Sequence, residues 1–378
     1  MSHPDRILIT VDPVGSAWSY VLTLIPYLQS LQIKVLLAIT GGDLRADQEA
    51  QLAALPELTW SHLPGKLAWM EDPWNDVNAT GGWLIRLAKE FRPNLVHVNS
   101  YSFAALPWRV PVLVTAQACA ISWWQAVKGL PIPEHLREYH RRVSLGLQAA
   151  TKIVSATRHT LNTLYCNYGF TTPSQVVRHG RDFPEIRTPE KRPYILSAGR
   201  CWDEARNVML LESIADKLSW PVYVSGTTVH PQTGEIVELH NAQSLGWLND
   251  QGFHEAVAHA AVMAAPVLYE PFSFSVLEAA SHGCALVLGD IPSMREIWKD
   301  VAIFIPPDRP DLWQSQLQLL CENPAWARLL GERAKKRARA YSGLEMAADY
   351  VETYDSLLNN TPLIRRKAPR ARIEVALA

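Results

Sequence analysis

The sequence lacks the local signatures of three large enzyme classes. It contains no G-x-S-x-G elbow, no Walker phosphate loop and no G-x-G-x-x-G fingerprint. These absences argue against a serine hydrolase, a P-loop nucleotidase and a dinucleotide-dependent enzyme. Metal ligands at helical spacing are also missing, because pairs such as His135/His140 and His254/His259 are five residues apart and would not share one helix face. We therefore expect neither a metal nor a bound cofactor.

Paired cysteines and a strong net charge are missing as well. The five cysteines are widely spaced and form no C-x-x-C pair, which argues against a zinc module and for a reducing compartment. The formal net charge is −1, so the chain has no overall basic field of the kind that nucleic-acid binding needs. The exception is the segment 363–378, with five Lys/Arg and one Glu. A solvated chain end is the simpler interpretation, and contact with an anionic lipid surface or an acidic partner is the alternative.

Long apolar runs are absent too. No run reaches membrane-spanning length, and the first six residues, Met-Ser-His-Pro-Asp-Arg, lead into a strand without the apolar region of a signal peptide. We expect a cytoplasmic protein, with peripheral contact at the inner membrane face as a further option.

The alternation of apolar strands and amphipathic helices is present in two successive halves. It predicts an α/β fold with two Rossmann-like, doubly wound parallel sheets whose carboxyl edges face a central cleft. A stretch rich in proline and charge separates the halves, which gives a first domain at 1–182, a linker at 183–193, a second domain at 194–340, and a C-terminal helix and basic tail at 341–378. The predicted strands are 6–11, 34–40, 95–98, 112–115, 153–155, 175–177, 194–197, 222–225, 261–268 and 286–288, and the predicted helices include 18–31, 134–150, 207–218, 251–260, 309–322, 324–340 and 344–359.

The stretch 269–280, Tyr-Glu-Pro-Phe-Ser-Phe-Ser-Val-Leu-Glu-Ala-Ala, is predicted to be a strand-loop-helix corner. Such a corner lies at the carboxyl edge of a parallel sheet, where the free N–H groups of the new helix favour an anion. Glu270 is expected to end the strand and Glu278 to lie in the helix, so the site suits a ligand with both phosphates and hydroxyls. In the simpler interpretation, Ser275-x-x-Glu278 is a capping box and Glu270 is a solvated strand end.

Two arginines follow the first strand of the second half. Arg200 comes directly after that strand, and Arg206 stands where the next helix is expected to begin. Two guanidinium groups beside a helix N-terminus can neutralise a diphosphate without a metal ion. The alternative makes Arg206 an ordinary surface residue and Arg200 an ion-pair partner of Asp203 or Glu204.

Two other features suggest ligand contacts in the first half. Gly15 lies in the turn after the first strand, where a glycine lets the backbone approach a ligand, although any tight turn has the same need. Most of the fourteen tryptophans are expected to be packing residues. Trp123 and Trp124 follow the loop after strand 112–115, and we interpret them as a flat platform for a sugar or an apolar acceptor.

Four segments together resemble the retaining nucleotide-sugar glycosyltransferases of family 4, which have the two-domain GT-B fold. They are 200–207 (Arg-Cys-Trp-Asp-Glu-Ala-Arg-Asn), 245–248 (Leu-Gly-Trp-Leu), 270–279 (Glu-Pro-Phe-Ser-Phe-Ser-Val-Leu-Glu-Ala) and 289–296 (Gly-Asp-Ile-Pro-Ser-Met-Arg-Glu). The resemblance extends over nearly the whole chain, and the two glutamates eight residues apart are its most specific element.

The resemblance implies a role for each matching residue. Glu270 would hydrogen-bond the donor sugar, Glu278 the ribose, and the nucleotide base would lie near Leu245-Gly246. Arg200 and Arg206 would bind the diphosphate, and Gly15 of the other domain would face it. The backbone N–H groups around Phe274 and Ser275 would bind the same phosphates or the sugar.

The sequence departs from the family pattern at four positions. Gln117 stands where many relatives have a histidine near the donor sugar, and a glutamine can donate a hydrogen bond there but cannot act as a base. Arg206 replaces the commoner lysine, Ser273 a usual glycine, and His179 a usual asparagine. In the family the departing phosphate is thought to take the proton of the acceptor, so that Gln117 is compatible with catalysis.

The resemblance and the residues together predict a retaining, metal-independent transferase. It would move a hexose from a UDP- or GDP-sugar to a hydroxyl of a glycan, a glycolipid or a small molecule. The alternative is a GT-B protein that has lost transfer and binds a sugar nucleotide or a partner glycosyltransferase. A glycosidase would also use two carboxylates but would have no use for phosphate-binding arginines.

Overall fold

The structure of the chain is a computed structural model that describes residues 4–55, 57–184, 190–231 and 233–359. Its residues form two compact units. Unit 1 combines the chain up to Ile121, Ile132–Arg181 and the chain from Gly343, and unit 2 combines Ser122–Pro131 with Asp182–Ser342. The predicted basic tail and residues 185–189 of the predicted linker lie outside the described residues.

Unit 1 contains a parallel sheet of seven strands in the order β3-β2-β1-β4-β5-β6-β7. The interior strand β1 pairs in register with β2 from Arg6↔Lys34 to Val11↔Ile39 and with β4 on its other side. Its apolar residues are buried, as expected for a strand covered on both faces. The strands are β1 (Arg6–Val11), β2 (Lys34–Gly41), β3 (Thr59–Pro64), β4 (Leu95–Val98), β5 (Val112–Ala116), β6 (Lys152–Ser155) and β7 (Ser174–Val176).

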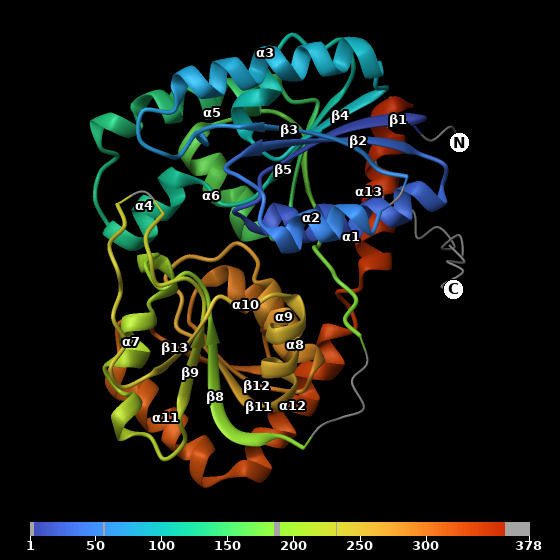
Figure 1. Cartoon of the computed structure of the whole chain (residues 1–378). Helices are drawn as coiled ribbons and strands as arrows, with labels where there is room; N and C mark the ends of the chain where they lie inside the picture. Colours follow the sequence, from blue (N-terminus) through green and yellow to red (C-terminus); the bar gives the residue numbers. More distant parts are fainter. Residues whose placement is uncertain (1–3, 56, 185–189, 232, 360–378) are drawn as a thin grey trace. The chain divides into compact units, whose positions relative to one another are not determined.

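Helices cover both faces of this sheet, with α3 and α5 on one side and α1 and the C-terminal helix α13 on the other (Figure 1). Gly146 lets α5 approach η1 closely, because a Cβ at this position would lie 1.9 Å from the carbonyl oxygen of Tyr101. The helices of unit 1 are α1 (Ser16–Ser30), α2 (Ala46–Ala53), α3 (Trp74–Phe91), η1 (Tyr101–Ala105), η2 (Glu134–Leu136), α5 (Arg137–Ala149), α6 (Arg158–Tyr168) and α13 (Gly343–Leu358), and α4 (Ala120–Lys128) begins in this unit and continues in unit 2.

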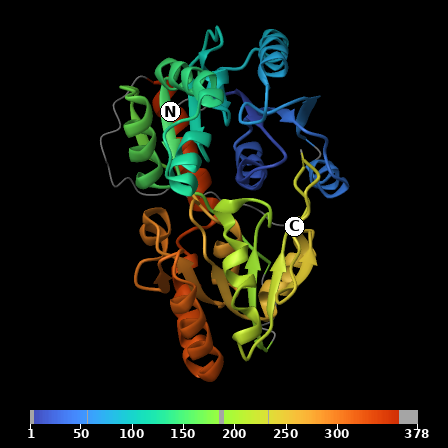
Figure 2. The same ribbon diagram turned by 90° about the vertical axis from the view of Figure 1, so that its left-hand side faces the viewer.

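Helix α13 completes unit 1 although it follows unit 2 in the sequence. Figures 1 and 2 show it in red among elements drawn in blue and green. Its buried tyrosines join a polar cluster in the core: Tyr354 Oη lies 2.8 Å from His97 Nδ1, and Tyr350 Oη lies 3.1 Å from Thr115 Oγ1. Tyr350 also stacks on Tyr20 of α1. Specific hydrogen bonds therefore fix the place of α13.

Unit 2 contains a parallel sheet of six strands in the order β10-β9-β8-β11-β12-β13. The first strand in the sequence, β8, lies between β9 and β11, so the chain reverses its direction of winding at this point of the sheet, as it does between β1 and β4 in unit 1. Both sheets thus have the doubly wound arrangement that the sequence predicted. The strands are β8 (Arg192–Ala198), β9 (Val222–Ser225), β10 (Gln243–Gly246), β11 (Ala260–Ala265), β12 (Ala285–Gly289) and β13 (Ala302–Ile305).

In unit 2, α7 and α11 pack on one face of the sheet and α8 and α9 on the other (Figure 1). The predicted helix at 207–218 is wrong in its length, because this segment divides into a short α-helix and a 3₁₀ turn. The helices are η3 (Glu204–Arg206), α7 (Val208–Glu212), η4 (Ala215–Lys217), α8 (Asp250–His259), α9 (Phe274–Ser281), α10 (Pro292–Trp298), α11 (Pro310–Glu322) and α12 (Pro324–Ala338).

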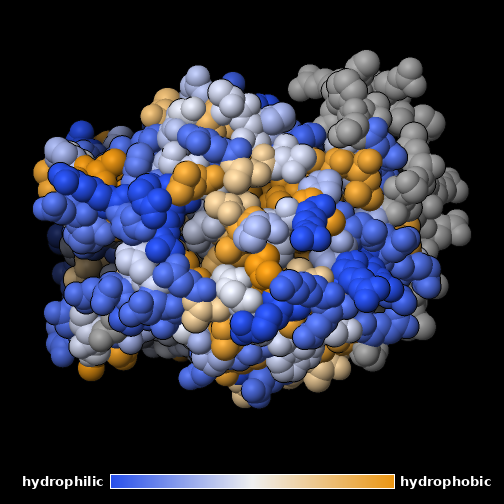
Figure 3. All heavy atoms as spheres, turned by 90° about the horizontal axis from the view of Figure 1, so that it is seen from above, coloured by the Kyte–Doolittle hydropathy of each residue, from blue (hydrophilic) through white to orange (hydrophobic). Residues whose placement is uncertain are grey.

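The face seen in Figure 3 carries apolar residues in small separate groups among polar ones. Within the described part of the chain, no helix combines the length and the apolar character that a bilayer crossing requires. In doubly wound sheets, ligands bind at the carboxyl edge. There the loops after neighbouring strands meet at the point where the chain reverses its direction of winding.

Candidate active site

The loop after β8 begins with a glycine that the site geometry requires. Gly199 has a φ of 152°, and a Cβ at this position would lie 2.8 Å from Cδ of Arg206. A second glycine, Gly226, packs against the first, because its own Cβ would lie 1.8 Å from the carbonyl oxygen of Gly199. These two glycines let the side chain of Arg206 lie directly against the strand ends.

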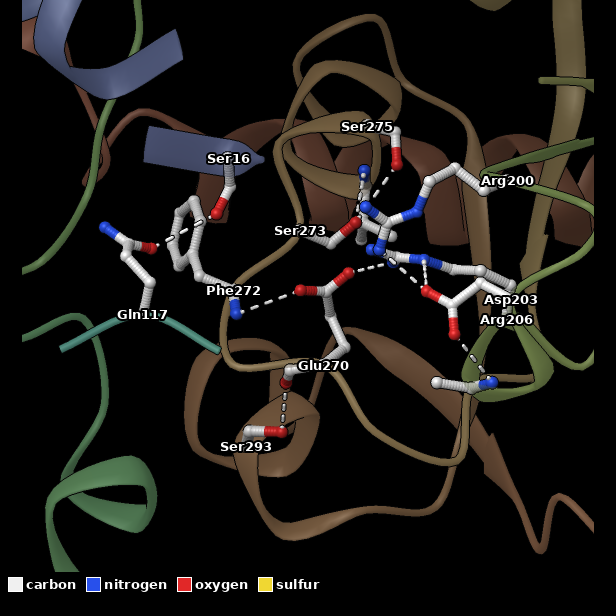
Figure 4. Close-up of polar contacts among 12 residues, drawn as sticks. Ser16, Gln117, Arg200, Asp203, Arg206, Glu270, Phe272, Ser273, Ser275 and Ser293 are labelled. Carbon is white, nitrogen blue, oxygen red and sulfur yellow. Dashed lines mark hydrogen bonds and ion pairs between the residues drawn. The ribbon is translucent and has the colours of Figure 1, made fainter. Parts of the chain in front are cut away.

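Both predicted arginines contact the carboxylate of Asp203. Arg200 Nη2 donates to Asp203 Oδ2 at 2.7 Å, and Arg206 Nε lies 3.9 Å from the same oxygen (Figure 4). The ion pair between Arg200 and Asp203 is one that the simpler interpretation of the sequence named. Asp203 is 6% exposed, so this carboxylate belongs to the interior of the site.

The structure places Glu270 in a loop and not at a strand end. Strand β11 ends at Ala265, so the predicted strand 261–268 is too long; Pro266, which has no N–H group for the ladder, follows directly. The buried Glu270 side chain accepts hydrogen bonds from Arg206 Nη1 and from the Phe272 N–H (3.3 Å), and its backbone carbonyl accepts one from Ser293 Oγ (2.6 Å) (Figure 4). Glu270 is thus held through both its side chain and its backbone.

Helix α9 begins two residues earlier than the predicted capping box requires. Ser273 is the N-cap, and its hydroxyl accepts from the Val276 N–H at 3.4 Å and lies 3.0 Å from Ser275 Oγ. The capping-box interpretation of Ser275 and Glu278 is therefore wrong. The first N–H groups of an α-helix have no partner within the helix, so Phe274 and Ser275 lie in the turn that can donate to an anion.

Glu278 is fixed by a histidine that the sequence analysis did not assign to the site. His254 Nδ1 of α8 lies 3.0 Å from Glu278 Oε1. The ring of His282 meets the ring of His254 edge to face, with 4.4 Å between centroids. Burial lowers the pKa of His282 to about 4, so this second histidine stays neutral. The spacing of histidines along the sequence could not reveal the contact between His254 and Glu278, because these residues lie on two different helices, α8 and α9.

The electrostatics favour the ionised forms of Arg206 and Asp203. Burial lowers the pKa of Arg206, but Glu270 and Asp203 outweigh it and raise the pKa above its ordinary value. Burial likewise raises the pKa of Asp203, and Arg200 and Arg206 outweigh it and lower the pKa. Nε of Arg200 and Nε of Arg206 are both buried without a hydrogen-bond partner in the described residues. Buried donors without partners are rare in folded proteins and are expected where a ligand binds.

In unit 1, Gln117 directly follows β5, and both the oxygen and the nitrogen of its side-chain amide have hydrogen-bond partners. Its Oε1 accepts from Ser16 Oγ at 3.1 Å (Figure 4), and its Nε2 lies 3.0 Å from His179 Nε2. Gly15 is the N-cap of α1, and its N–H donates to Asp12 Oδ1 at 2.9 Å. The Gly15 backbone is extended, so no unusual dihedral requires a glycine there.

The two predicted platform tryptophans both lie in unit 2 and use their indole nitrogens differently. Trp123 Nε1 donates to Asp203 Oδ1 at 3.0 Å, whereas Trp124 Nε1 donates to the carbonyl of Pro131 at 3.1 Å. Trp123 therefore contacts the arginine-binding carboxylate directly. Among the described residues, no three His, Cys, Asp or Glu side chains are grouped so that they could hold a metal ion.

Sequence patterns of two glycosyltransferase families match this chain. The pattern described as Glycosyltransferase Family 4 matches residues 17–183, and the one described as Glycosyl transferases group 1 matches residues 192–323.

Two curated relatives are similar over part of their length. The O-antigen chain mannosyltransferase RfbU of Salmonella typhimurium is 24% identical over 149 residues, which is 37% of this chain and 41% of the relative. The O-antigen chain mannosyltransferase B of Escherichia coli is 23% identical over 172 residues, 46% of this chain and 39% of the relative. The matched region thus spans about two fifths of each relative.

Solved structures share the fold at low sequence identity. Sucrose-phosphate synthase from Thermosynechococcus elongatus superposes with a TM-score of 0.75 at 15% identity, covering 94% of this chain and 100% of that structure. The lipopolysaccharide-biosynthesis glycosyltransferase WaaG superposes with a TM-score of 0.69 at 14% identity, covering 92% of this chain and 99% of that structure. With its two doubly wound sheets and its two family patterns, the chain belongs to the GT-B glycosyltransferases, and it combines a family 4 N-terminal half with a group 1 C-terminal half.

Proposed function

We propose that the protein is a retaining, metal-independent hexosyltransferase that uses a UDP- or GDP-sugar as donor and an acceptor hydroxyl as nucleophile. The observation that carries the proposal is the pair of buried Nε groups of Arg200 and Arg206, which have no hydrogen-bond partner in the described residues. Both belong to the loop after β8, at the reversal point of the sheet in unit 2, where α/β proteins bind their ligands.

The arrangement suits the leaving group of such a transfer. When the bond to the sugar breaks, negative charge develops on the diphosphate. The fixed guanidinium groups of Arg200 and Arg206 and the N-terminal turn of α9 provide preorganised donors for that charge. Two arginines thus supply the positive charge that a metal ion supplies in other phosphate-transfer sites.

Glu270 and Glu278 provide the acceptors for hydroxyl groups of the donor. Glu270 is buried beside Arg206, and its Oε1 accepts from a single backbone N–H in the described residues, which leaves capacity for a sugar hydroxyl. Glu278 is oriented by His254 and is proposed to bind the ribose. Gln117, held by Ser16 and His179, is proposed to donate a hydrogen bond to the sugar.

The curated relatives suggest the type of reaction. Both are named as O-antigen chain mannosyltransferases, and WaaG is described as acting in lipopolysaccharide biosynthesis. We therefore propose a hexose such as mannose as the transferred sugar and a growing glycan or glycolipid as the acceptor. The location in the cell is proposed to be the cytoplasm or its membrane face.

The test is turnover of UDP- and GDP-hexoses by the wild type with a panel of glycan and glycolipid acceptors, in buffer with and without EDTA. We expect turnover with one donor, no effect of EDTA, and a product with the anomeric configuration of the donor. Glu270→Ala is expected to lower turnover at least a hundredfold, whereas Glu255→Ala, on the exposed side of α8, serves as the control. Donor binding without turnover by the wild type would instead favour a binding protein that has lost transfer.

A further inference from the structure

We propose that Asp203 is the positioning residue for both diphosphate-binding arginines, and that Trp123 holds Asp203 in place. This inference rests on the proposed function, because it takes Arg200 and Arg206 to be the donor's phosphate ligands. It gives Trp123 a role in the donor site that differs from the acceptor platform predicted from the sequence.

The carboxylate of Asp203 is surrounded by donors from two segments, the loop 200–206 and the segment that contains Trp123. Oδ1 accepts from Trp123 Nε1 at 3.0 Å and from the Ala205 N–H at 3.1 Å. Oδ2 accepts from Arg200 Nη2 at 2.7 Å and faces Arg206 Nε at 3.9 Å. A carboxylate has about four lone-pair sites, and three hydrogen bonds from the protein occupy most of them.

A negative charge beside a diphosphate site needs a physical reason. An ionised carboxylate repels a phosphate, and the low pKa of Asp203 keeps it ionised. Asp203 therefore does not act as a ligand for an anion. Asp203 favours diphosphate binding if ordering Arg200 and Arg206 contributes more free energy than its repulsion of the phosphates costs.

Ordering matters because an arginine side chain has many rotamers. A guanidinium that is fixed before the ligand arrives loses less entropy when it binds. Gly199 lets the aliphatic part of Arg206 lie against the strand end, and Asp203 and Glu270 hold its guanidinium. Arg200 has fewer partners than Arg206. Its Nη2 donates to Asp203, and its guanidinium carbon lies over the ring of Trp202, 5.2 Å from the ring centre. Loss of Asp203 should thus affect Arg200 most.

Trp123 reaches Asp203 from a segment that the chain inserts into unit 2. Ser122–Pro131 belongs to unit 2, although unit 1 residues flank it in the sequence. A second contact supports the same segment, since Lys128 Nζ donates to Glu204 at 2.6 Å and lies 5.9 Å from the ring centre of Trp123. An indole N–H can only donate, so Trp123 fixes one oxygen of Asp203 and leaves the other to the arginines.

The experiment compares Asp203→Asn and Trp123→Phe with two matched controls. Trp60→Phe changes an exposed tryptophan to which no role in the site is assigned, and Asp290→Asn removes an aspartate that pairs with Arg295 near the surface. Calorimetry with UDP and GDP measures binding of the leaving group. We expect Asp203→Asn to weaken it about tenfold or more and Trp123→Phe less strongly, with both controls within about twofold of the wild type.

Labelling with phenylglyoxal provides a readout that needs no nucleotide. We expect Arg200 to be modified faster in Asp203→Asn and in Trp123→Phe than in the wild type and the controls, as mapped by mass spectrometry. Unchanged labelling, or nucleoside diphosphate binding equal to or tighter than that of the wild type, would overturn the positioning role. Faster labelling together with no binding of UDP or GDP by the wild type would keep the positioning role and overturn the proposed function.

Thermal unfolding of each variant shows whether a loss of binding reflects a loss of fold. If Asp203→Asn does not fold, Trp123→Phe tests the proposal.

Discussion

The side-chain amide of Gln117 faces the imidazole of His179, with 3.0 Å between their Nε2 atoms. An amide nitrogen only donates, so Nε2 of His179 must accept and its ring must be neutral. Burial lowers the pKa of His179 to about 3, which agrees with a neutral ring. These are two of the positions at which the sequence departs from the family 4 pattern. Because the two side chains are in contact, we interpret the departures as one compensated change.

Replacing His179 by leucine is expected to lower turnover about tenfold. The substitution removes the acceptor of the Gln117 amide and leaves a buried donor unpaired, which costs about 1–3 kcal/mol. Steady-state kinetics measures the effect, with the free energy of unfolding determined in parallel. The double exchange Gln117→His with His179→Asn is expected to recover activity relative to either single substitution. Wild-type kinetics in His179→Leu would contradict the role of the pair.

The stability of unit 1 is expected to fall as the pH is lowered from about 6.5. Burial lowers the pKa of both His97 and His179 to about 3, whereas the unfolded chain takes up these protons near pH 6.5. The unfolded state therefore binds more protons between these two values, and each histidine contributes up to about 1.4 kcal/mol per pH unit. The stabilisation is complete above pH 6.5 and is lost as the pH approaches 3.

Urea unfolding between pH 5 and 6 measures this slope, because most carboxylates are ionised in both states there. The wild type is expected to take up close to two protons more on unfolding than a variant with both His97 and His179 replaced. Equal slopes for the two proteins would show that the buried histidines do not titrate as proposed.

The buried carboxylate of Glu212 is expected to stabilise unit 2. Its oxygens accept from three consecutive backbone N–H groups, those of His240, Asn241 and Ala242, at 2.8–2.9 Å. Burial raises its pKa, but these N–H groups outweigh it and lower the pKa. Glu212→Gln is expected to cost about 1–3 kcal/mol. Glu134→Gln, which breaks an exposed ion pair with Arg137, is expected to cost less than about 1 kcal/mol.

Hydrogen exchange locates the effect of Glu212→Gln. The amides of residues 240–242 are expected to exchange faster in the variant, while those of unit 1 stay unchanged. Full protection of these three amides would mean that the loop before β10 does not depend on the carboxylate.

Gly199→Ala is expected to weaken binding of a nucleoside diphosphate at least tenfold. The added methyl group meets Cδ of Arg206 at 2.8 Å, and the φ of 152° is unfavourable for alanine. The guanidinium must therefore move away from the site. Gly42→Ala is the control, because a Cβ there has no neighbour within 4 Å in the described structure. Calorimetric binding of UDP or GDP is the measurement, and unchanged affinity in Gly199→Ala would show that Arg206 does not bind the phosphates.

The central strands of both sheets could be predicted because their apolar runs are continuous. The predicted strands 95–98 and 222–225 coincide with β4 and β9, since buried parallel strands leave a clear pattern. The edge strands β3 and β10 were not predicted. Their side chains are largely exposed, so they carry little of the apolar signal that identifies a strand.

The residues of the candidate site could be named from the sequence, and so could the local partner of Arg200, Asp203, but the distant partners could not. Arg200, Arg206 and Glu270 follow or precede predicted elements and Glu278 lies in a predicted helix, and these positions together with the family resemblance led to their selection as candidates. The contacts of Asp203 with Trp123 and of Glu278 with His254 join residues 80 and 24 positions apart. No local pattern encodes such pairs, because they depend on how loops and helices pack.

The return of α13 to unit 1 has a consequence for synthesis of the protein. All of unit 2 is synthesised before helix α13. Tyr350 and Tyr354 of this helix complete the core of unit 1, so that core is finished last. During that interval the polar groups of His97 and Thr115 lack their tyrosine partners. The nascent chain should therefore carry an unfinished first unit, with a surface open to chaperones or to misfolding, until residue 358 has left the exit tunnel.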